Sequence, residues 1–275
     1  MGMKRRSVFL VSDGTGITAE ILSHSLLTQF PGFDFSITAI PYVNTEERAA
    51  LTAQKLSEAA VADGVEPLVF TTFADESLHD VIANAPGAFF DFFEAFIGPL
   101  ERVLGVASSH TRGRTHGLVD VDQYTSRISA IDYTMQCDDG VNIVDYDAAD
   151  LLLVGVSRSG KTPTCLYMAL HYGLRAANYP LLEDDLDRGR LPDGLRGMRE
   201  KLFGLTIDPI RLQQIRQERR PNSRYARLAQ CRREVQAAEA MFKAERLPYL
   251  DVTVMSIEEI STTILDQRGL HRTFF

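Results

Sequence analysis

The hydrophobic residues of the chain fall into short apolar runs separated by longer stretches with helical spacing. In the N-terminal part the runs predict β-strands at residues 7–12, 35–43 and 67–72, and the spacing predicts helices at residues 17–30, at residues 45–62 and after Asp75. Strands that alternate with helices imply a parallel sheet with right-handed crossovers. We therefore expect an N-terminal parallel α/β unit.

The middle of the chain is less regular. We expect an apolar helix at residues 88–104, a small, polar and basic loop at residues 105–117, and a second helix at residues 122–137 that Asp138-Asp139-Gly140 ends.

Beyond residue 140 the alternation of strands and helices returns. Strands are predicted at residues 151–154, 175–181, 201–207 and 248–253, and helices at residues 164–172, from Pro209, and from Ser256 to about residue 267.

A glycine-rich motif follows the strand predicted at residues 151–154. Residues 155–162 read G-x-x-x-x-G-K-T, the pattern of the phosphate-binding P-loop, and a predicted helix comes next. The backbone N–H groups of such a loop and the N-terminus of the helix favour an anion. The candidate nucleotide-binding residues are Gly155, Val156, Ser157, Arg158, Ser159, Gly160, Lys161 and Thr162. We expect Lys161 to reach the β/γ-phosphates and the Thr162 hydroxyl to hold Mg²⁺.

This motif defines the second half of the molecule. We divide the chain into an N-terminal α/β domain at residues 1–147 and a P-loop kinase-like α/β domain at residues 148–275. The net charge is −8, but residues 1–150 hold 9 Lys+Arg and 22 Asp+Glu (−13), whereas residues 151–275 hold 20 and 15 (+5). The basic half thus contains the predicted polyphosphate site.

The composition argues against several other classes of protein. A sequence pI near 5.3 argues against a general nucleic-acid binder. The longest aromatic stretch, residues 88–97, is interrupted by Asp91 and Glu94, so we expect no membrane span. The three cysteines are widely spaced, which fits free thiols in a reducing cytosol, and we therefore expect a cytoplasmic protein.

Four further features are candidates for chemistry. His116 lies in a polar loop and could act as an acid or base, although a surface histidine is at least as consistent with its surroundings. Asp184 and Asp185 follow a predicted strand and could serve the metal or accept a proton, or be simple loop charges. Asp208 could cap a helix or hold the metal. The turn at residues 13–16 could be a second phosphate site or a plain turn between a strand and a helix.

An arginine-rich segment covers residues 211–233. Such a run is usually a solvated helix face. Here the break at Pro221-Asn222-Ser223 and the preceding P-loop favour a lid that closes arginines over transferring phosphates.

Several motifs are spaced in order along nearly the whole chain. They are Val11-Ser-Asp-Gly-Thr-Gly16, Arg114-Thr-His-Gly-Leu118, Ile131-Asp-Tyr-Thr134 with Asp138-Asp-Gly140, Gly155-Val-Ser-Arg-Ser-Gly-Lys-Thr-Pro-Thr164, Ala177-Asn-Tyr-Pro180 and Leu202-Phe-Gly-Leu-Thr-Ile-Asp-Pro209. Together they resemble the phosphoenolpyruvate synthase regulatory protein family, of which a related branch regulates pyruvate, phosphate dikinase. The motifs at residues 114–118 and 177–180 look more like the phosphoenolpyruvate synthase branch.

The resemblance implies two opposed reactions. Proteins of this family are bifunctional serine/threonine kinases and phosphorylases that use ADP to phosphorylate a threonine beside the catalytic histidine of the target enzyme, and so inactivate it. They reverse the modification with inorganic phosphate and release pyrophosphate. The resemblance therefore implies phosphoenolpyruvate synthase as protein substrate, ADP and inorganic phosphate as co-substrates, and residues 155–162 as the nucleotide site. The N-terminal domain then becomes a candidate for target recognition.

Composition and spacing alone indicate only a phosphate site, so other functions stay open. The same reactions could act on pyruvate, phosphate dikinase. A P-loop small-molecule kinase would share the motif, and so would a non-catalytic nucleotide-sensing regulator. The catalytic base and a homo-oligomeric state are open as well.

Overall fold

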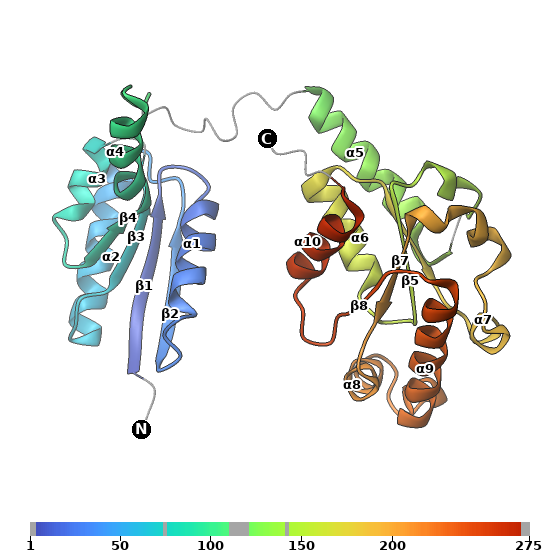
Figure 1. Cartoon of the computed structure of the whole chain (residues 1–275). Helices are drawn as coiled ribbons and strands as arrows, with labels where there is room; N and C mark the ends of the chain where they lie inside the picture. The colour runs from blue at the N-terminus through green and yellow to red at the C-terminus, as the bar shows by residue number, and fades with distance from the viewer. Residues whose placement is uncertain (1–3, 74–75, 110–120, 141–142, 271–275) are drawn as a thin grey trace. The chain divides into compact units, whose positions relative to one another are not determined.

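The chain folds into two compact units, Met1–Leu118 and Val119–Phe275 (Figure 1). The structure, a computed structural model, describes residues 4–73, 76–109, 121–140 and 143–270. Each unit contains a four-stranded sheet in which all paired strands run parallel. The predicted α/β class is therefore confirmed. Among the helices of the described residues, none has the length and apolar character needed to cross a membrane.

The N-terminal unit is a sheet covered by helices on both faces. Its elements are β1 (Lys4–Ser12), α1 (Ile17–Leu27), β2 (Phe33–Ile40), α2 (Glu46–Asp63), β3 (Leu68–Thr72), α3 (Glu76–Ala83), β4 (Ala88–Asp91) and α4 (Phe92–Leu104), and the sheet order is β2-β1-β3-β4. Successive side chains of β1 point to opposite faces. Phe9 and Val11 pack with α2 and α3, whereas Val8 and Leu10 pack with α1 and α4.

The single helix predicted at residues 88–104 is wrong in its first four residues. Ala88–Asp91 pairs in parallel with β3, and the helix begins only at Phe92. The carboxylate of Asp91 accepts the backbone N–H of Glu94 at 2.7 Å and so caps α4. Four apolar residues are too few to separate a strand period from a helix period. The other predicted strands and helices of this unit are confirmed, while the proposed cap Asp75 lies outside the described residues.

The C-terminal unit is built on the same principle. Its elements are α5 (Val121–Gln136), η1 (Asp138–Gly140), η2 (Ile143–Ala148), β5 (Leu151–Gly155), α6 (Lys161–Tyr172), β6 (Ala176–Pro180), α7 (Glu183–Arg188), η3 (Asp193–Lys201), β7 (Leu202–Thr206), α8 (Pro209–Arg219), η4 (Arg224–Ala226), α9 (Leu228–Glu245), β8 (Tyr249–Asp251) and α10 (Ile257–Arg268), where η marks a 3₁₀-helix. The sheet order is β6-β5-β7-β8. Every residue of β5 and β7 is buried, as expected for inner parallel strands.

The boundary between the units differs from the sequence interpretation, which divided the chain after residue 147. Helix α5 packs against α6, so the structural division falls before α5. Asp208, a candidate for a helix cap or a metal ligand, caps a helix, and the helix predicted from Ser256 is confirmed. The Asp208 carboxylate accepts two backbone N–H groups of α8, and Ser256 forms a capping box with Glu259 at the start of α10.

The two sheets share one topology, although the sequence shows no internal repeat. In each, the first strand lies inside, with the second strand on one side and the third and fourth on the other. Strands β1 and β5 are equivalent, and each leads through a glycine of positive φ (Gly16, 81°; Gly160, 85°) into a helix. Sheets of this kind bind ligands at the carboxyl ends of the strands where the strand order reverses. Residues 13–16 and 155–160 both lie at such a point.

Candidate functional site

The loop at residues 155–162 joins β5 to α6, and two of its glycines are required by geometry. A Cβ atom at Gly155 would lie 2.4 Å from the backbone oxygen of Leu205 on β7, so no other residue fits. Gly160 is the N-cap of α6 in the left-handed conformation, which glycine adopts without strain. The chain therefore turns sharply from a buried strand into a helix N-terminus, the arrangement that suits an anion.

Lys161 is the first residue of α6 and is buried, with 4% of its surface exposed. Its ammonium group folds back and donates to the backbone oxygen of Val156 at 3.0 Å. Burial lowers the pKa of Lys161 to about 8, against the opposite influence of the Asp139 and Asp138 carboxylates. A phosphate beside this lysine would add negative charge and so favour its protonated form.

Thr162 is held by a residue from a distant part of the sequence. Its hydroxyl donates to Oδ1 of Asp138 in η1 at 2.8 Å. The side-chain amide of Asn178 on β6 donates to the same oxygen at 2.5 Å, and the Asn178 side-chain oxygen accepts the Asp139 N–H at 3.3 Å. Asn178 is fully buried, so β6 fixes η1 beside the start of α6.

These residues fit a magnesium ion. Mg²⁺ prefers oxygen ligands and usually takes one or two carboxylates together with substrate phosphates. The Thr162 hydroxyl and the Asp138 carboxylate lie within hydrogen-bonding distance of each other and are both ligands of this kind. Within the described residues, no cluster of three or more His, Cys, Asp or Glu side chains could hold a metal by itself. Thr162 and Asp138 would therefore hold Mg²⁺ only together with phosphate oxygens.

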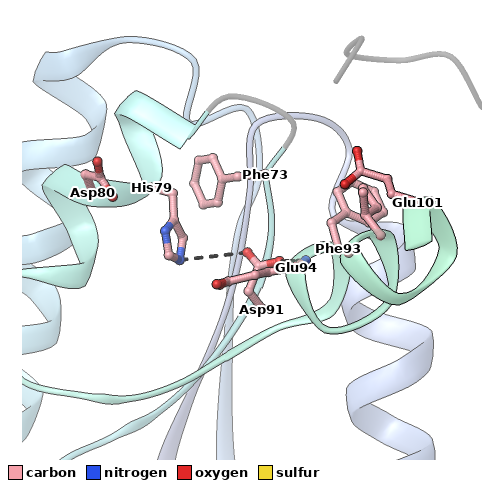
Figure 2. A pocket seen from close by; sticks show the side chains of 9 residues that line it. Phe73, His79, Asp80, Asp91, Phe93, Glu94 and Glu101 are labelled. Carbon is pink, nitrogen blue, oxygen red and sulfur yellow. Dashed lines mark hydrogen bonds and ion pairs between the residues drawn. The ribbon is translucent and has the colours of Figure 1, made fainter. Parts of the chain in front are cut away.

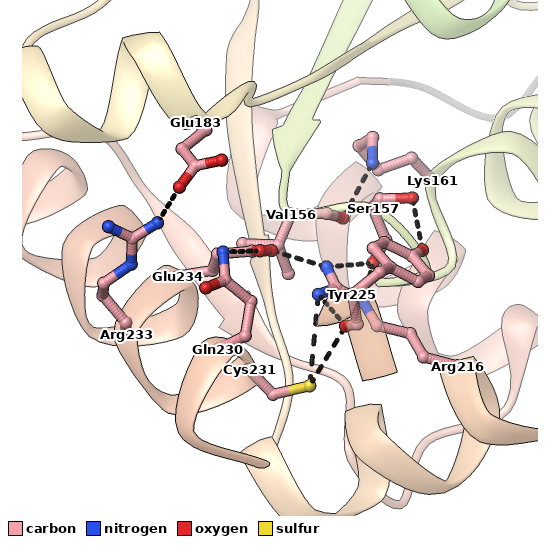
Figure 3. Close-up of polar contacts among 10 residues, drawn as sticks. All are labelled: Val156, Ser157, Lys161, Glu183, Arg216, Tyr225, Gln230, Cys231, Arg233 and Glu234. Atoms are coloured by element: carbon pink, nitrogen blue, oxygen red, sulfur yellow. Dashed lines mark hydrogen bonds and ion pairs between the residues drawn. The ribbon is translucent and has the colours of Figure 1, made fainter. Parts of the chain in front are cut away.

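The arginine-rich segment is not uniformly a lid. Arg216 is fully buried and contacts the backbone oxygen of Ser157 (Figure 3), so the prediction of a lid is wrong for this residue. Arg224 and Arg233 are exposed and both donate to the carboxylate of Glu183 on α7. A lid formed by the remaining arginines stays a prediction.

The other predicted catalytic residues are not brought together with Lys161 by any contact described. Asp185 is buried at the start of α7, where its carboxylate accepts the backbone N–H of Leu182 at 3.0 Å and the Tyr179 hydroxyl at 3.2 Å. Asp184 is exposed on the same helix. His116 lies outside the described residues. Their catalytic roles stay predictions.

A second candidate site is a cavity of about 460 Å³ in the N-terminal unit, where β3 and β4 end (Figure 2). Its charged lining residues are Asp80, Asp91, Glu94 and Glu101, with His79 beside them. Asp91 accepts the Thr71 hydroxyl at 2.7 Å and lies 3.8 Å from Nε2 of His79. Among the described lining residues there is no lysine or arginine, and carboxylates repel phosphate. The loop at residues 155–162 is therefore the better phosphate site.

The sequence interpretation assigned no role at the site to Asp138 or Asn178, and it gave Arg216 a role only within the predicted lid. Asp138 was treated as the end of a helix, and Arg216 as one of the arginines that would close over transferring phosphates. A buried asparagine within a predicted inner strand was the one available signal for Asn178, since such a side chain needs partners for its amide.

Comparison with known proteins identifies the family to which the chain belongs. The model of the kinase/pyrophosphorylase family matches residues 8–265. A protein of Legionella pneumophila (strain Lens) named as a phosphoenolpyruvate synthase regulatory protein is 53% identical over 268 residues, which cover 98% of this chain and 99% of the relative. Proteins with the same name in Stenotrophomonas maltophilia (strain R551-3) and Marinobacter nauticus are 53% and 48% identical, over 98% of this chain and at least 98% of their own lengths. The chain therefore belongs to the phosphoenolpyruvate synthase regulatory protein family of kinase/pyrophosphorylases.

Proposed function

We propose that the protein is an ADP-dependent serine/threonine kinase and phosphate-dependent phosphorylase that regulates phosphoenolpyruvate synthase in the cytoplasm. In the first reaction the β-phosphoryl group of ADP passes to a threonine oxygen of the target, the threonine proton goes to a base, and AMP leaves. In the second, inorganic phosphate attacks the phosphothreonine phosphorus, and pyrophosphate and the free threonine are formed. The names of the relatives support phosphoenolpyruvate synthase as the target.

The observation that carries this proposal is the arrangement of Lys161, Thr162 and Asp138 at the N-terminus of α6. Lys161 is buried beside the loop, and Thr162 is hydrogen-bonded to Asp138. Both reactions move a phosphoryl group between two oxygens, so both need the same positive groups and the same metal around it. Lys161, the loop N–H groups and bound Mg²⁺ supply them in either direction.

The base that accepts the threonine proton must lie near the transferring group and be open to a protein substrate, and a carboxylate can serve in this role. Asp139 meets both conditions. It is exposed, its φ of 49° turns the backbone at η1, and its charge is the largest carboxylate influence on Lys161. The Asp185 carboxylate is already engaged by the chain. We therefore assign Asp139 as the base of the kinase reaction.

The test uses the purified protein with phosphoenolpyruvate synthase, ADP and Mg²⁺. Target activity should fall as its threonine becomes phosphorylated, and it should recover on addition of inorganic phosphate. Parallel samples contain pyruvate, phosphate dikinase or small alcohols instead. Transfer only to the dikinase, or only to small alcohols, would replace the proposed substrate. ADP binding without label on any acceptor would show a nucleotide sensor instead.

A further inference from the structure

Arg216 places a buried positive charge directly beside the loop at residues 155–162 (Figure 3). Its guanidinium group donates to the Ser157 backbone oxygen through Nη2 at 3.0 Å and through Nε at 3.4 Å. A buried charge is costly unless it is paired, and the Glu234 carboxylate on α9 lies 2.7 Å from Nη2. Arg216 is thus held by α9 while it holds the loop.

Tyr225 in η4 contacts both Arg216 and Ser157. The Arg216 guanidinium lies 4.0 Å from the centre of the Tyr225 ring and donates to the Tyr225 backbone oxygen at 3.1 Å. The Tyr225 and Ser157 hydroxyls share a hydrogen bond of 2.8 Å. Ser157 is therefore fixed at its backbone oxygen by Arg216 and at its side chain by Tyr225.

These contacts of Ser157 also orient the following peptide N–H, that of Arg158. The peptide between Ser157 and Arg158 is planar and trans, so its C=O and N–H point in opposite directions. Holding the Ser157 oxygen toward Arg216 aims the Arg158 N–H away from Arg216. Arg158 also has φ of 75°, a conformation that a non-glycine residue adopts only when its surroundings impose it. Successive N–H groups in such a turn are the donors that bind phosphate.

We infer that Arg216 is a positioning residue for phosphoryl transfer, which it supports by orienting the Ser157–Arg158 peptide so that the Arg158 N–H is directed at phosphate. The inference rests on the proposed function, because it takes the loop as the phosphate site. The rival explanation is a core ion pair that merely joins α8 to α9. The two differ in what a lysine at this position would preserve. It keeps a charge for Glu234, but it cannot repeat the forked contacts of the guanidinium with the Ser157 and Tyr225 oxygens.

The experiment compares the wild-type protein with Arg216→Lys, Tyr225→Phe and the control Arg196→Lys, which changes an exposed arginine of η3 outside the arginine-rich segment. For each we would measure thermal stability, ADP affinity by calorimetry, and kcat and KM for threonine phosphorylation. Arg216→Lys should lower ADP affinity and reduce kcat by roughly 10- to 100-fold, because a misdirected donor affects both binding and transfer. Tyr225→Phe should give a smaller loss in the same direction, and Arg196→Lys none.

Two results would overturn the inference. One is a lower melting temperature for Arg216→Lys with unchanged ADP affinity and unchanged kcat, which is the signature of a purely structural ion pair. The other, if Arg216→Lys does not fold, is a folded Tyr225→Phe variant with wild-type affinity and kcat. A wild-type protein that binds ADP but phosphorylates nothing would refute the proposed function alone. In that case the relative ADP affinities of the variants still decide the role of Arg216.

Discussion

The Thr162 hydroxyl donates a hydrogen bond of 2.8 Å to the carboxylate of Asp138, a residue 24 positions earlier in the chain. Thr162 lies in the first turn of α6 and Asp138 in η1, and buried Asn178 on β6 holds Asp138 in place. The hydroxyl that would serve Mg²⁺ in the proposed function is therefore oriented by contacts within the protein itself. Orientation of a ligand by a fixed neighbour strengthens metal binding.

Asp138→Asn should therefore weaken the use of Mg²⁺. The amide keeps an oxygen for Thr162 but loses the charge that attracts the cation. We expect the Mg²⁺ concentration for half-maximal kinase activity to rise roughly 10-fold or more. Asp132→Asn, an exposed change on α5, is the matched control. Equal Mg²⁺ requirements for both variants would show that Asp138 does not serve the metal.

Proton uptake should accompany ADP binding near pH 8. The pKa of Lys161 is about 8 in the free protein because the side chain is buried. A bound phosphate favours the charged lysine and raises this pKa, so binding at pH 8 should take up roughly half a proton, and affinity should fall as the pH rises above 8. The nucleotide phosphates are already ionised there, since their second pKa lies near 6.

Calorimetry in two buffers of different ionisation enthalpy measures this uptake. Lys161→Arg is the control, because arginine stays protonated throughout this pH range. The wild-type protein should show uptake and the arginine variant none. Zero uptake in the wild type, or equal uptake in both proteins, would mean that Lys161 does not meet the phosphate.

Gly155→Ala should destabilise the protein. The added methyl group would lie 2.4 Å from the backbone oxygen of Leu205, and backbone cannot yield as a flexible side chain can. Overpacking of this kind costs about 1–3 kcal/mol. Gly197→Ala is the control, because nothing lies within 4 Å of its Cβ position. Thermal unfolding of both variants checks the prediction, and equal melting temperatures would contradict the close approach of β5 and β7.

The local elements of the fold could be predicted from the sequence because their signals lie within a few residues. The strand, glycine loop and helix around Gly155 and the capping box at Ser256 are such cases. β4 was missed because its run of four residues is too short to show a period. The common topology of the two sheets could not be predicted from the sequence either, because strand order depends on pairing between distant segments.

The candidate site could be predicted only in the part that one loop supplies. Asn178 holds Asp138 beside Thr162 because the parallel sheet brings β6 beside β5, and no local pattern encodes these contacts. The burial of Arg216 beside the loop could not be predicted from the sequence either. In the sequence it belongs to a run of arginines that is typical of a solvated face, yet Glu234 and the Ser157 oxygen give it partners inside the molecule. Burial of one arginine among many depends on tertiary contacts.

Asp139→Asn should abolish most of the kinase activity, because Asp139 is assigned as the base. Loss of a general base typically costs 10²- to 10⁴-fold, and we expect a fall in kcat of about this size with little change in ADP affinity. Asp184→Asn, also an exposed aspartate of the C-terminal unit, is the control and tests the earlier candidate. A large fall in kcat for Asp184→Asn and none for Asp139→Asn would reverse the assignment.

The most direct test of the account follows the phosphoryl group itself. The protein is incubated with phosphoenolpyruvate synthase, Mg²⁺ and ADP labelled with ³²P in the β-phosphate, and unlabelled inorganic phosphate is then added. The label should first appear on a threonine of the target, with release of AMP, and should then move into pyrophosphate. Lys161→Met, which removes the charge from the loop, should lose both steps together. Failure of the wild-type protein to label the target, or a folded Lys161→Met variant that transfers label as the wild type does, would contradict the account.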